Sequence, residues 1–199
     1  MADEIYLIMN KPRGYVCSAV SDSHKTVYDL LTPELRTLVQ GAKRGHRLHT
    51  IGRLDCDTSG LLLFTTDGFF SHKVTSSKEI GGESLEKTYR ATLSRPVSPE
   101  EQASYKARAA AGLTLPPEKK FGEQMSAPAE LAFTGSPACA TTTCTITVRE
   151  GKFHEVRRIF RALGNEVVEL ERISIGSLQL PSDLAPGQWR TMTDVEIIC

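Results

Sequence analysis

Two aspartates that stand directly before an apolar run are the residues of this chain best suited to chemistry. Asp55 and Asp57 lie in the stretch IGRLDCDTSGLLLF, with Arg53 ahead of them and three leucines behind. Residues two apart on an extended chain share a face, and a charged group is almost never fully buried without a partner. The pattern therefore predicts either an aspartate-capped turn or a carboxylate that a cation holds in place as a nucleophile or base.

The segment FHEVRRIFRALGN, residues 153–165, offers cations for such a carboxylate. Its apolar residues recur at helical spacing, which predicts an amphipathic helix, and basic residues repeat that spacing on an adjacent face. The apolar stripe is Val156, Ile159, Phe160 and Leu163, and the cationic face is His154, Arg157, Arg158 and Arg161. The cationic face is either solvated or a binding surface for phosphates and for the aspartate.

A tyrosine between cations is the third candidate group. Tyr89 lies beside Lys87 and Arg90 in EKTYRATL, residues 86–93, whose alternation of period two predicts a strand. An aromatic ring between basic residues is suited to stacking on a nucleobase. The alternative is an ordinary, half-buried strand tyrosine.

Composition limits the class of protein. Of the 199 residues, 40% are hydrophobic and 24% charged, typical of a globular protein. The 24 basic and 24 acidic residues cancel, which is weak evidence against nucleic-acid binding, although a neutral sum can hide a basic face. No apolar run approaches the roughly 20 residues of a membrane helix, and no signal peptide is evident. We expect a cytoplasmic protein without a membrane partner, whose five cysteines are free thiols rather than zinc ligands.

The elements that must position these residues follow an α+β pattern, with neighbouring strands separated by helices. The expected strands are residues 5–9, 15–20, 47–51, 60–66, 86–93, 128–133, 141–150, 166–180 and 187–193. The expected helices are residues 25–35, interrupted near Pro33, and residues 67–76, 98–112, 153–165 and 194–198. Residues 116–128 are expected to form a polar loop. The helix at 98–112 has the clearest signals, because Ser98 and Glu101 can form a capping box and Gly112 can end it.

One competing interpretation is a phosphotransferase. The sequence LDCDTSG resembles the nucleophile loop of haloacid-dehalogenase-type phosphatases. That loop should follow a nearly continuous apolar strand and requires downstream aspartates that hold magnesium. Neither feature is found, so this interpretation is disfavoured.

Five ordered segments together resemble the pseudouridine synthase family, in the branch that modifies ribosomal RNA. They span about residues 5–192 and comprise NKPRGYVCS, GRLDCDTSGLLLFTTDG, EKTYRATL, EGKFHEVRRIFRALGNEVVELERISIG and DLAPGQWR. The resemblance implies a mixed, mainly antiparallel sheet flanked by helices, with an active-site cleft at its centre. It also implies one catalytic domain over residues 1–199, which can divide into two subdomains that share an extended sheet. We expect a monomer in which the accessory RNA-binding domain that commonly precedes the catalytic domain in related enzymes does not accompany it.

The resemblance assigns roles to individual residues. Asp55 resembles the family's catalytic aspartate, Tyr89 the tyrosine that stacks on the flipped uracil, and Arg157 the basic partner of the aspartate. Leu170 resembles the apolar residue beside the base, and Arg53 the side chain that helps displace the target nucleotide. Asp57 is treated as a loop residue. Further substrate contacts are expected from basic residues: Lys11, Arg13, Lys87, Arg158 and Arg161.

The implied reaction is the isomerisation of uridine to pseudouridine in ribosomal RNA. It neither oxidises the substrate nor moves a phosphate, so no cofactor or metal is expected. The partner is ribosomal RNA or a pre-ribosomal particle. Similarity of YVCS, FFSHKVTS and NEVVEL to the small-subunit enzyme favours 16S rRNA, and a large-subunit site is the alternative. A binding or ribosome-assembly factor without catalytic activity remains a further hypothesis.

Overall fold

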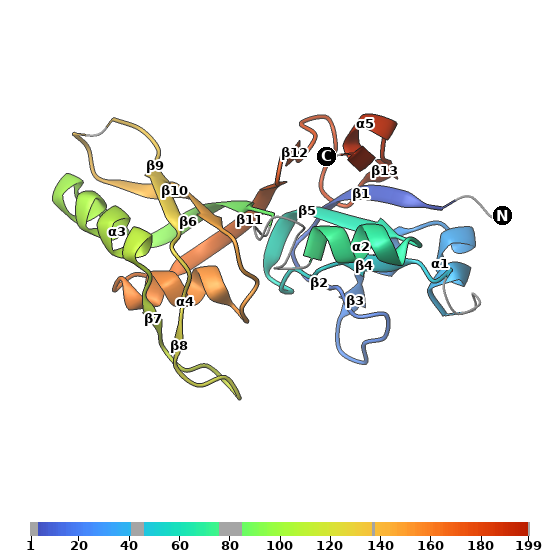
Figure 1. Ribbon diagram of the computed structural model, residues 1–199, viewed down its shortest axis with the longest axis horizontal. Coiled ribbons are helices and arrows are strands. Elements are labelled where there is room, and N and C mark those ends of the chain that lie inside the picture. The colour runs from blue at the N-terminus through green and yellow to red at the C-terminus, as the bar shows by residue number, and fades with distance from the viewer. Residues whose placement is uncertain (1–3, 41–45, 76–84, 137, 199) are drawn as a thin grey trace. The chain divides into compact units, whose positions relative to one another are not determined.

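The computed structural model describes residues 4–40, 46–75, 85–136 and 138–198, and it is an α+β structure (Figure 1). Its chain forms two compact units, Met1–Leu85 with Arg172–Cys199, and Glu86–Glu171. Strand β11 (Val167–Ile175) passes from the second unit into the first at Arg172. No helix in the described part is long and apolar enough to cross a membrane.

The first unit is built around one buried strand. β5 (Thr58–Thr65) pairs antiparallel with β1 (Tyr6–Lys11) and with β4 (His49–Ile51), and β1 pairs with β13 (Trp189–Thr191). The remaining elements are β2 (Tyr15–Val16), β3 (Lys25–Thr26), the 3₁₀ helix η1 (Val27–Leu30), α1 (Pro33–Gln40), α2 (Gly68–Thr75), β12 (Leu178–Gln179) and α5 (Asp194–Ile198).

The apolar run after the two aspartates is the interior of β5. Leu61, Leu62, Leu63 and Phe64 are at most 1% exposed, so both faces of this strand are covered. A strand buried on both faces reads as a continuous apolar run rather than an alternating one. The loop before β5 is therefore fixed at one end by the most deeply buried segment of the unit.

The second unit places two helices against an antiparallel sheet. Its strand order is β11, β6 (Lys87–Val97), β10 (Thr141–Val148) and β9 (Glu130–Phe133). Helices α3 (Pro99–Ala111) and α4 (Glu155–Ala162) contribute apolar residues to its core, and β7 (Thr114–Leu115) and β8 (Gln124–Met125) form a hairpin (Figure 1). The apolar stripe predicted for residues 153–165 is buried in this core, which confirms its orientation.

The predicted capping signals of α3 are confirmed. Ser98 Oγ accepts a hydrogen bond from the Glu101 backbone N–H at 3.3 Å, and the Glu101 carboxylate accepts one from the Ser98 N–H at 3.1 Å. Gly112 ends the helix with φ of +81°, in the left-handed region that glycine adopts without strain.

Two predicted elements are wrong in detail. The helix expected over residues 25–35 is a short strand and a 3₁₀ turn, and α1 begins at Pro33 instead of being interrupted there. Proline suits the first turn of a helix because its missing N–H would have no partner at that position. The loop expected over residues 116–128 includes β8, whose two residues pair with β7. The end of the helix expected over 67–76 lies outside the described residues beyond Thr75.

The capping box gives a first test of the fold. Replacing Ser98 with Ala removes one of its two bonds and should lower stability by about 1 kcal/mol, which is a fall in Tm of roughly 2–4 °C in a chain of this size. Ser104→Ala, at an exposed position in the same helix, should not lower Tm. Thermal unfolding followed by circular dichroism measures both, and equal Tm values for the two variants would contradict the assigned cap.

Candidate active site

A buried lysine holds the loop that carries Asp55. Lys11 ends β1 and is 0% exposed. Its ammonium donates to the backbone oxygens of Thr58 at 2.7 Å, Asp55 at 3.0 Å and Pro12 at 3.1 Å, and approaches that of Cys56 at 3.5 Å. One cation thus replaces water for several carbonyl groups that no strand partner satisfies. The loop between β4 and β5 is tied to the end of β1.

Two further contacts hold the same loop from the side of residues 14–17. The Gly14 N–H donates to the Cys56 carbonyl at 2.7 Å. The Cys17 thiol lies 3.4 Å from both the backbone nitrogen and the backbone oxygen of Leu54, and it donates to the oxygen. The segment NKPRGYVCS therefore packs against GRLDCD, and the two sequence segments form one local structure.

The charges around this loop influence each other. Burial lowers the pKa of Lys11, and negative charge at Cys17, Cys56, Asp55 and Asp57 opposes that shift. Burial disfavours the charged form of Cys17 as well, which raises the pKa of this thiol, so it stays protonated at neutral pH. The Lys11 ammonium therefore lies in a group of acidic side chains, in addition to its contacts with the carbonyl groups.

Asp55 is held by this structure through its backbone. Asp55 is half-buried, and its backbone oxygen also accepts from the Thr58 N–H at 3.1 Å, which closes a turn. Arg53 and Arg13 are exposed on the two neighbouring segments. The first unit therefore brings Arg53, Asp55, Arg13 and Lys11 together, as four of the predicted site residues.

Arg172 is a buried cation that was not predicted from the sequence. It is 3% exposed, and its Nε donates to the Leu61 carbonyl at 2.9 Å. One terminal nitrogen, Nη2, is buried without a hydrogen-bond partner among the described residues. Its charge helps to lower the pKa of Cys17 against the effect of burial, so the guanidinium lies near the loop.

Gly60 allows this approach between β5 and β11. A Cβ atom at residue 60 would lie 2.3 Å from the Arg172 carbonyl oxygen, and Gly60 has φ of +101°. Both the space and the backbone conformation thus exclude other residues. The signal that could have identified Arg172 is its position, because Leu170, Arg172 and Ser174 occupy the buried face of an alternating strand.

The second unit holds the other predicted site residues. Tyr89 is half-buried on β6, opposite Ile146 of β10, and packs against the core to which Leu170 belongs. Arg157 is half-buried on α4 and donates from Nη1 to the Val167 carbonyl at 2.9 Å. Lys87 is half-buried on β6, and its charge opposes the burial that raises the pKa of Glu155.

Comparison with known proteins identifies the family of this chain. Residues 5–162 match the model of the RNA pseudouridylate synthase family. The ribosomal small subunit pseudouridine synthase A of Escherichia coli K12 is 39% identical over 192 residues, which are 96% of this chain and 72% of that protein. The protein of the same name from Vibrio cholerae is 38% identical over the same shares of the two chains. The chain belongs to the RNA pseudouridylate synthase family.

A solved structure supports the same assignment. The crystal structure of a pseudouridylate synthase superimposes with a TM-score of 0.81 at 37% sequence identity, and the match covers 100% of this chain and 74% of that one. The predicted α+β pseudouridine synthase fold and the predicted enzyme class are thereby confirmed. The phosphotransferase interpretation is excluded as the family of this chain.

Two of the predicted substrate contacts have structural roles in this pseudouridine synthase. Lys11 and Arg158 are both 0% exposed. The Arg158 guanidinium donates to the carbonyls of Pro116, Gly122 and Phe153 and to the Gln124 side chain, at 2.7–3.4 Å. Because backbone acceptors surround both cations, neither is available to a phosphate, and the expected contacts by Lys11 and Arg158 are corrected. Arg161 is exposed and paired with Glu118 at 2.9 Å.

The predicted ion pair between Asp55 and Arg157 joins residues of different units, Asp55 in the first and Arg157 in the second. It stays a prediction, as do the stacking of Tyr89 on uracil and the contribution of Arg53 to displacing the nucleotide.

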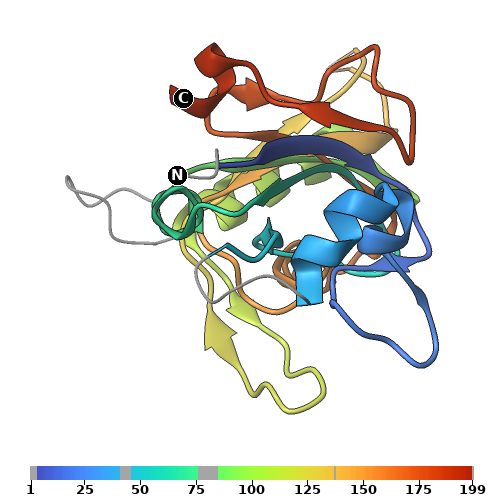
Figure 2. The same cartoon turned by 90° about the vertical axis from the view of Figure 1, so that its right-hand side faces the viewer.

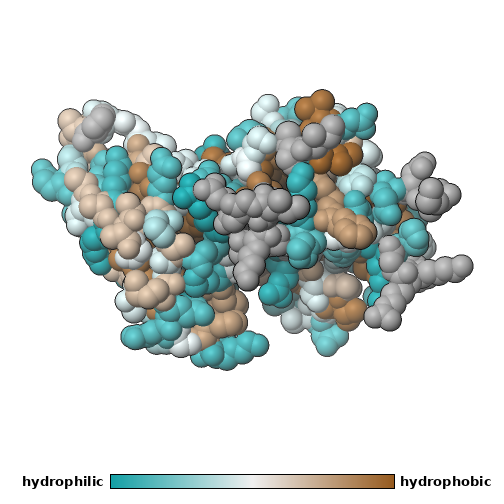
Figure 3. Space-filling view, in the orientation of Figure 1, coloured by the Kyte–Doolittle hydropathy of each residue, from teal (hydrophilic) through white to brown (hydrophobic). Residues whose placement is uncertain are grey.

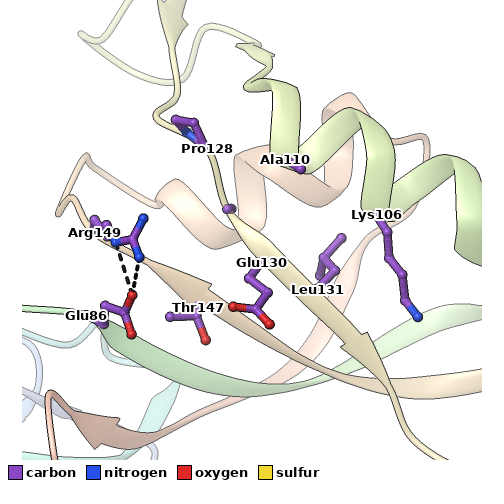
Figure 4. Close-up of a pocket in the computed structure, with 9 residues that line it drawn as sticks. Glu86, Lys106, Ala110, Pro128, Glu130, Leu131, Thr147 and Arg149 are labelled. Carbon is purple, nitrogen blue, oxygen red and sulfur yellow. Dashed lines mark hydrogen bonds and ion pairs between the residues drawn. The ribbon is translucent and has the colours of Figure 1, made fainter.

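A hollow of about 270 Å³ lies elsewhere in the pseudouridine synthase, in its second unit. Figure 4 shows an ion pair between Glu86 and Arg149 at one end and Lys106 at the other, with Glu130 and Thr147 between them. None of the predicted site residues lines it. Over the described ranges no three His, Cys, Asp or Glu side chains are grouped so that they could hold a metal ion, and Cys17, Cys56, Cys139 and Cys144 are free thiols.

The role of Lys11 gives a test on stability. Lys11→Met removes the donor that these buried carbonyl groups share, although the Asp55 carbonyl keeps the Thr58 N–H and the Cys56 carbonyl keeps the Gly14 N–H. The variant should lower stability by about 3 kcal/mol, which corresponds to a fall in Tm of roughly 6–12 °C. Lys25→Met, at an exposed position of the same unit, should change Tm little. An unchanged Tm for Lys11→Met would contradict the structural role. Calorimetry or circular dichroism measures the effect without reference to activity.

Proposed function

We propose that this enzyme isomerises a specific uridine of small-subunit ribosomal RNA to pseudouridine, with Asp55 as its catalytic carboxylate. One observation carries the proposal, namely the loop in which Lys11 holds the backbone of Asp55 while its side chain stays half-buried at the rim. The two relatives from Escherichia coli and Vibrio cholerae are small-subunit pseudouridine synthases, and 96% of this chain takes part in each match.

The reaction moves one bond and one proton. The bond between N1 of uracil and C1′ of the ribose breaks, the detached base rotates, and C5 then bonds to C1′. The proton lost from C5 and the proton gained by N1 balance, so the product is an isomer of the substrate. The enzyme must therefore supply a carboxylate close to the sugar and the base, and a place for the base to turn.

Asp55 supplies the carboxylate in this proposal. It acts as a nucleophile on the sugar or the base, or as the base that removes a sugar proton. Arg157 pairs with the carboxylate, so that the anion is stable in a site from which RNA excludes water. In support of this role, the Arg157 guanidinium is already held on one side by the Val167 carbonyl.

The target nucleotide has to leave the base stack first, which costs a few kcal/mol. In the proposal Tyr89 stacks on the flipped uracil and Leu170 packs beside it, which offsets this cost. Both side chains lie in or against one apolar core, so the platform is rigid. Arg53 fills the space that the nucleotide leaves, and Arg13, Lys87 and Arg161 contact phosphates.

The partner in this proposal is ribosomal RNA or a pre-ribosomal particle in the cytoplasm, and the enzyme acts as a monomer without a cofactor. Modification of large-subunit RNA is the competing outcome. The second competing outcome is a binding factor that uses the same fold without catalysis. That alternative was favoured by the basic face of residues 153–165, and the burial of Arg158 removes part of this face.

Asp55→Asn tests the catalytic assignment. The variant keeps the size and polarity of the side chain but loses its charge and one acceptor oxygen, so turnover should fall by at least about 10²–10⁴-fold. Asp57→Asn, two residues on and exposed, is the matched control and should retain activity. Mass-spectrometric mapping of derivatised pseudouridine, on rRNA from a deletion strain complemented by each variant, gives both activity and target.

The same map separates the alternatives. A modified uridine in large-subunit RNA would correct the target, and full modification by Asp55→Asn would refute the catalytic role. A growth defect of the deletion strain that Asp55→Asn relieves completely would favour a binding factor.

Arg157→Met tests the proposed ion pair. If Arg157 positions Asp55, single-turnover rates should fall by more than about tenfold, while the Kd for rRNA changes by less than about threefold, the effect of one phosphate contact. Arg36→Met, an exposed arginine on α1, should change neither quantity. Equal losses in rate and affinity would instead identify Arg157 as a phosphate contact.

A further inference from the structure

The hairpin of β7 and β8 forms an arm, which we define as residues 114–125. Figures 1 and 2 both show it extending away from the sheet of the second unit, beside α4. Its connecting segment between the two strands, residues 116–123, contains Lys119, Lys120 and Phe121. None of these residues belongs to the candidate active site.

Polar contacts fix the arm to the start of α4. The Arg158 guanidinium, fully buried, bridges the Pro116 and Gly122 carbonyls at the two sides of the turn, both at 2.8 Å. Glu118 accepts from Arg161 at 2.9 Å and is bonded to His154 Nδ1 at 2.8 Å. Burial raises the pKa of Glu118, but the bonds from Arg161 and His154 outweigh it and keep the pKa below its ordinary value.

The contact between the arm and α4 has a residue with a strained backbone on each side. Lys119 has φ of +52° and His154 has φ of +48°, and they are the only non-glycine residues with positive φ over the described residues. Such conformations persist where surrounding contacts enforce them and concentrate at functional sites. The shape of the turn is therefore imposed by its contacts and not by the preference of its own residues.

Three rings stack beneath the turn. The Phe121 and Phe153 rings are 4.7 Å apart and 19° from parallel, and the Phe153 and His154 rings are 3.8 Å apart and 16° from parallel. The Lys119 ammonium lies 5.4 Å from the centre of the Phe153 ring, and that of Lys120 lies 5.6 Å from the centre of the Phe121 ring. Each lysine is thus placed by a ring through a cation–π contact.

The charges of these two lysines are available to an anion. Both are exposed, and within the described part of the chain neither is paired with a carboxylate, whereas the neighbouring Arg161 is. A cation–π contact leaves most of an ammonium's hydrogen-bonding capacity unused, because the ring accepts through its face. Figure 3 shows mainly hydrophilic residues at the end of the arm, with hydrophobic ones among them.

We propose that the arm is a second RNA-binding surface of this enzyme, at which Lys119 and Lys120 each contact a phosphate of the substrate. The inference rests on the proposed function for the identity of the RNA. Adjacent phosphates in a chain match two adjacent cations fixed by rigid supports, and rings with interleaved cations are typical of surfaces that bind single-stranded RNA. Arg158, Glu118 and the ring stack are positioning groups, and the two lysines are the contacts.

The test compares wild type with the double variant Lys119→Gln/Lys120→Gln. Glutamine is polar but uncharged, and it tolerates the positive φ of residue 119 as well as lysine does. Lys106→Gln is the matched control, since Lys106 is also exposed, lies in the same unit and has its ammonium 6.0 Å from the centre of the Phe133 ring. The Kd for 16S rRNA transcribed in vitro is measured at two salt concentrations, about 50 and 200 mM.

Loss of two phosphate contacts should reduce the salt dependence as well as the affinity. Between those concentrations the affinity of wild type should fall about tenfold more than that of the double variant, the effect of two released counterions. The variant should bind more weakly than wild type at the lower concentration. Lys106→Gln should match wild type in both respects, and thermal unfolding should show all three proteins folded alike.

Three results would overturn the inference. They are an unchanged salt dependence in the double variant, an equal change in Lys106→Gln, and weaker binding to pre-ribosomal particles with unchanged binding to the naked RNA, which would identify a protein partner. Pseudouridine formation by wild type is scored separately, on the same transcript and on the pre-ribosomal particles. If wild type forms none on either, the proposed function fails, while the RNA contact of the arm is still decided by the salt dependence.

Discussion

The contact between the Lys11 ammonium and the backbone carbonyls of residues 55–58 is the constraint on which the rest of the first unit depends. A loop that joins two strands satisfies only part of its carbonyl groups with its own N–H groups, as the Thr58 N–H does for Asp55. Next to a buried strand it cannot turn all the others to water. A lysine at the end of the neighbouring strand satisfies them with one flexible side chain. These acceptors offset part of the cost of burying the cation, although burial still lowers the pKa of Lys11.

This arrangement explains how a carboxylate is held at the end of an apolar strand. Lys11 fixes the backbone of Asp55 through the carbonyl contact. The burial of β5 and the close approach of Gly60 to Arg172 fix the strand that follows Asp55 in the chain. The side chain itself needs no buried environment to be positioned, because its backbone is already placed.

Local patterns in the sequence were sufficient for most of the elements that position the candidate site. The capping signals of α3, the apolar stripe of α4 and the run that became β5 are each decided by neighbours within a few positions, so they could be predicted. The burial of Lys11 could not, because three of its four carbonyl acceptors lie 44 to 47 residues away. For the same reason the sequence could not predict that Arg158 is buried while Arg161 is exposed. Helical spacing places both on one face, but the arm, 34 to 42 residues upstream, covers Arg158 alone.

The most direct measurement of the central claim is a crystal structure of the Asp55→Asn variant bound to RNA that contains the target uridine. The account predicts a uridine outside the base stack, with its ring on Tyr89, its ribose within hydrogen-bonding distance of residue 55, and Lys11 still on the carbonyls of the loop. A uridine that remains stacked in the RNA, or one bound at another surface with residue 55 directed away from it, would contradict the account.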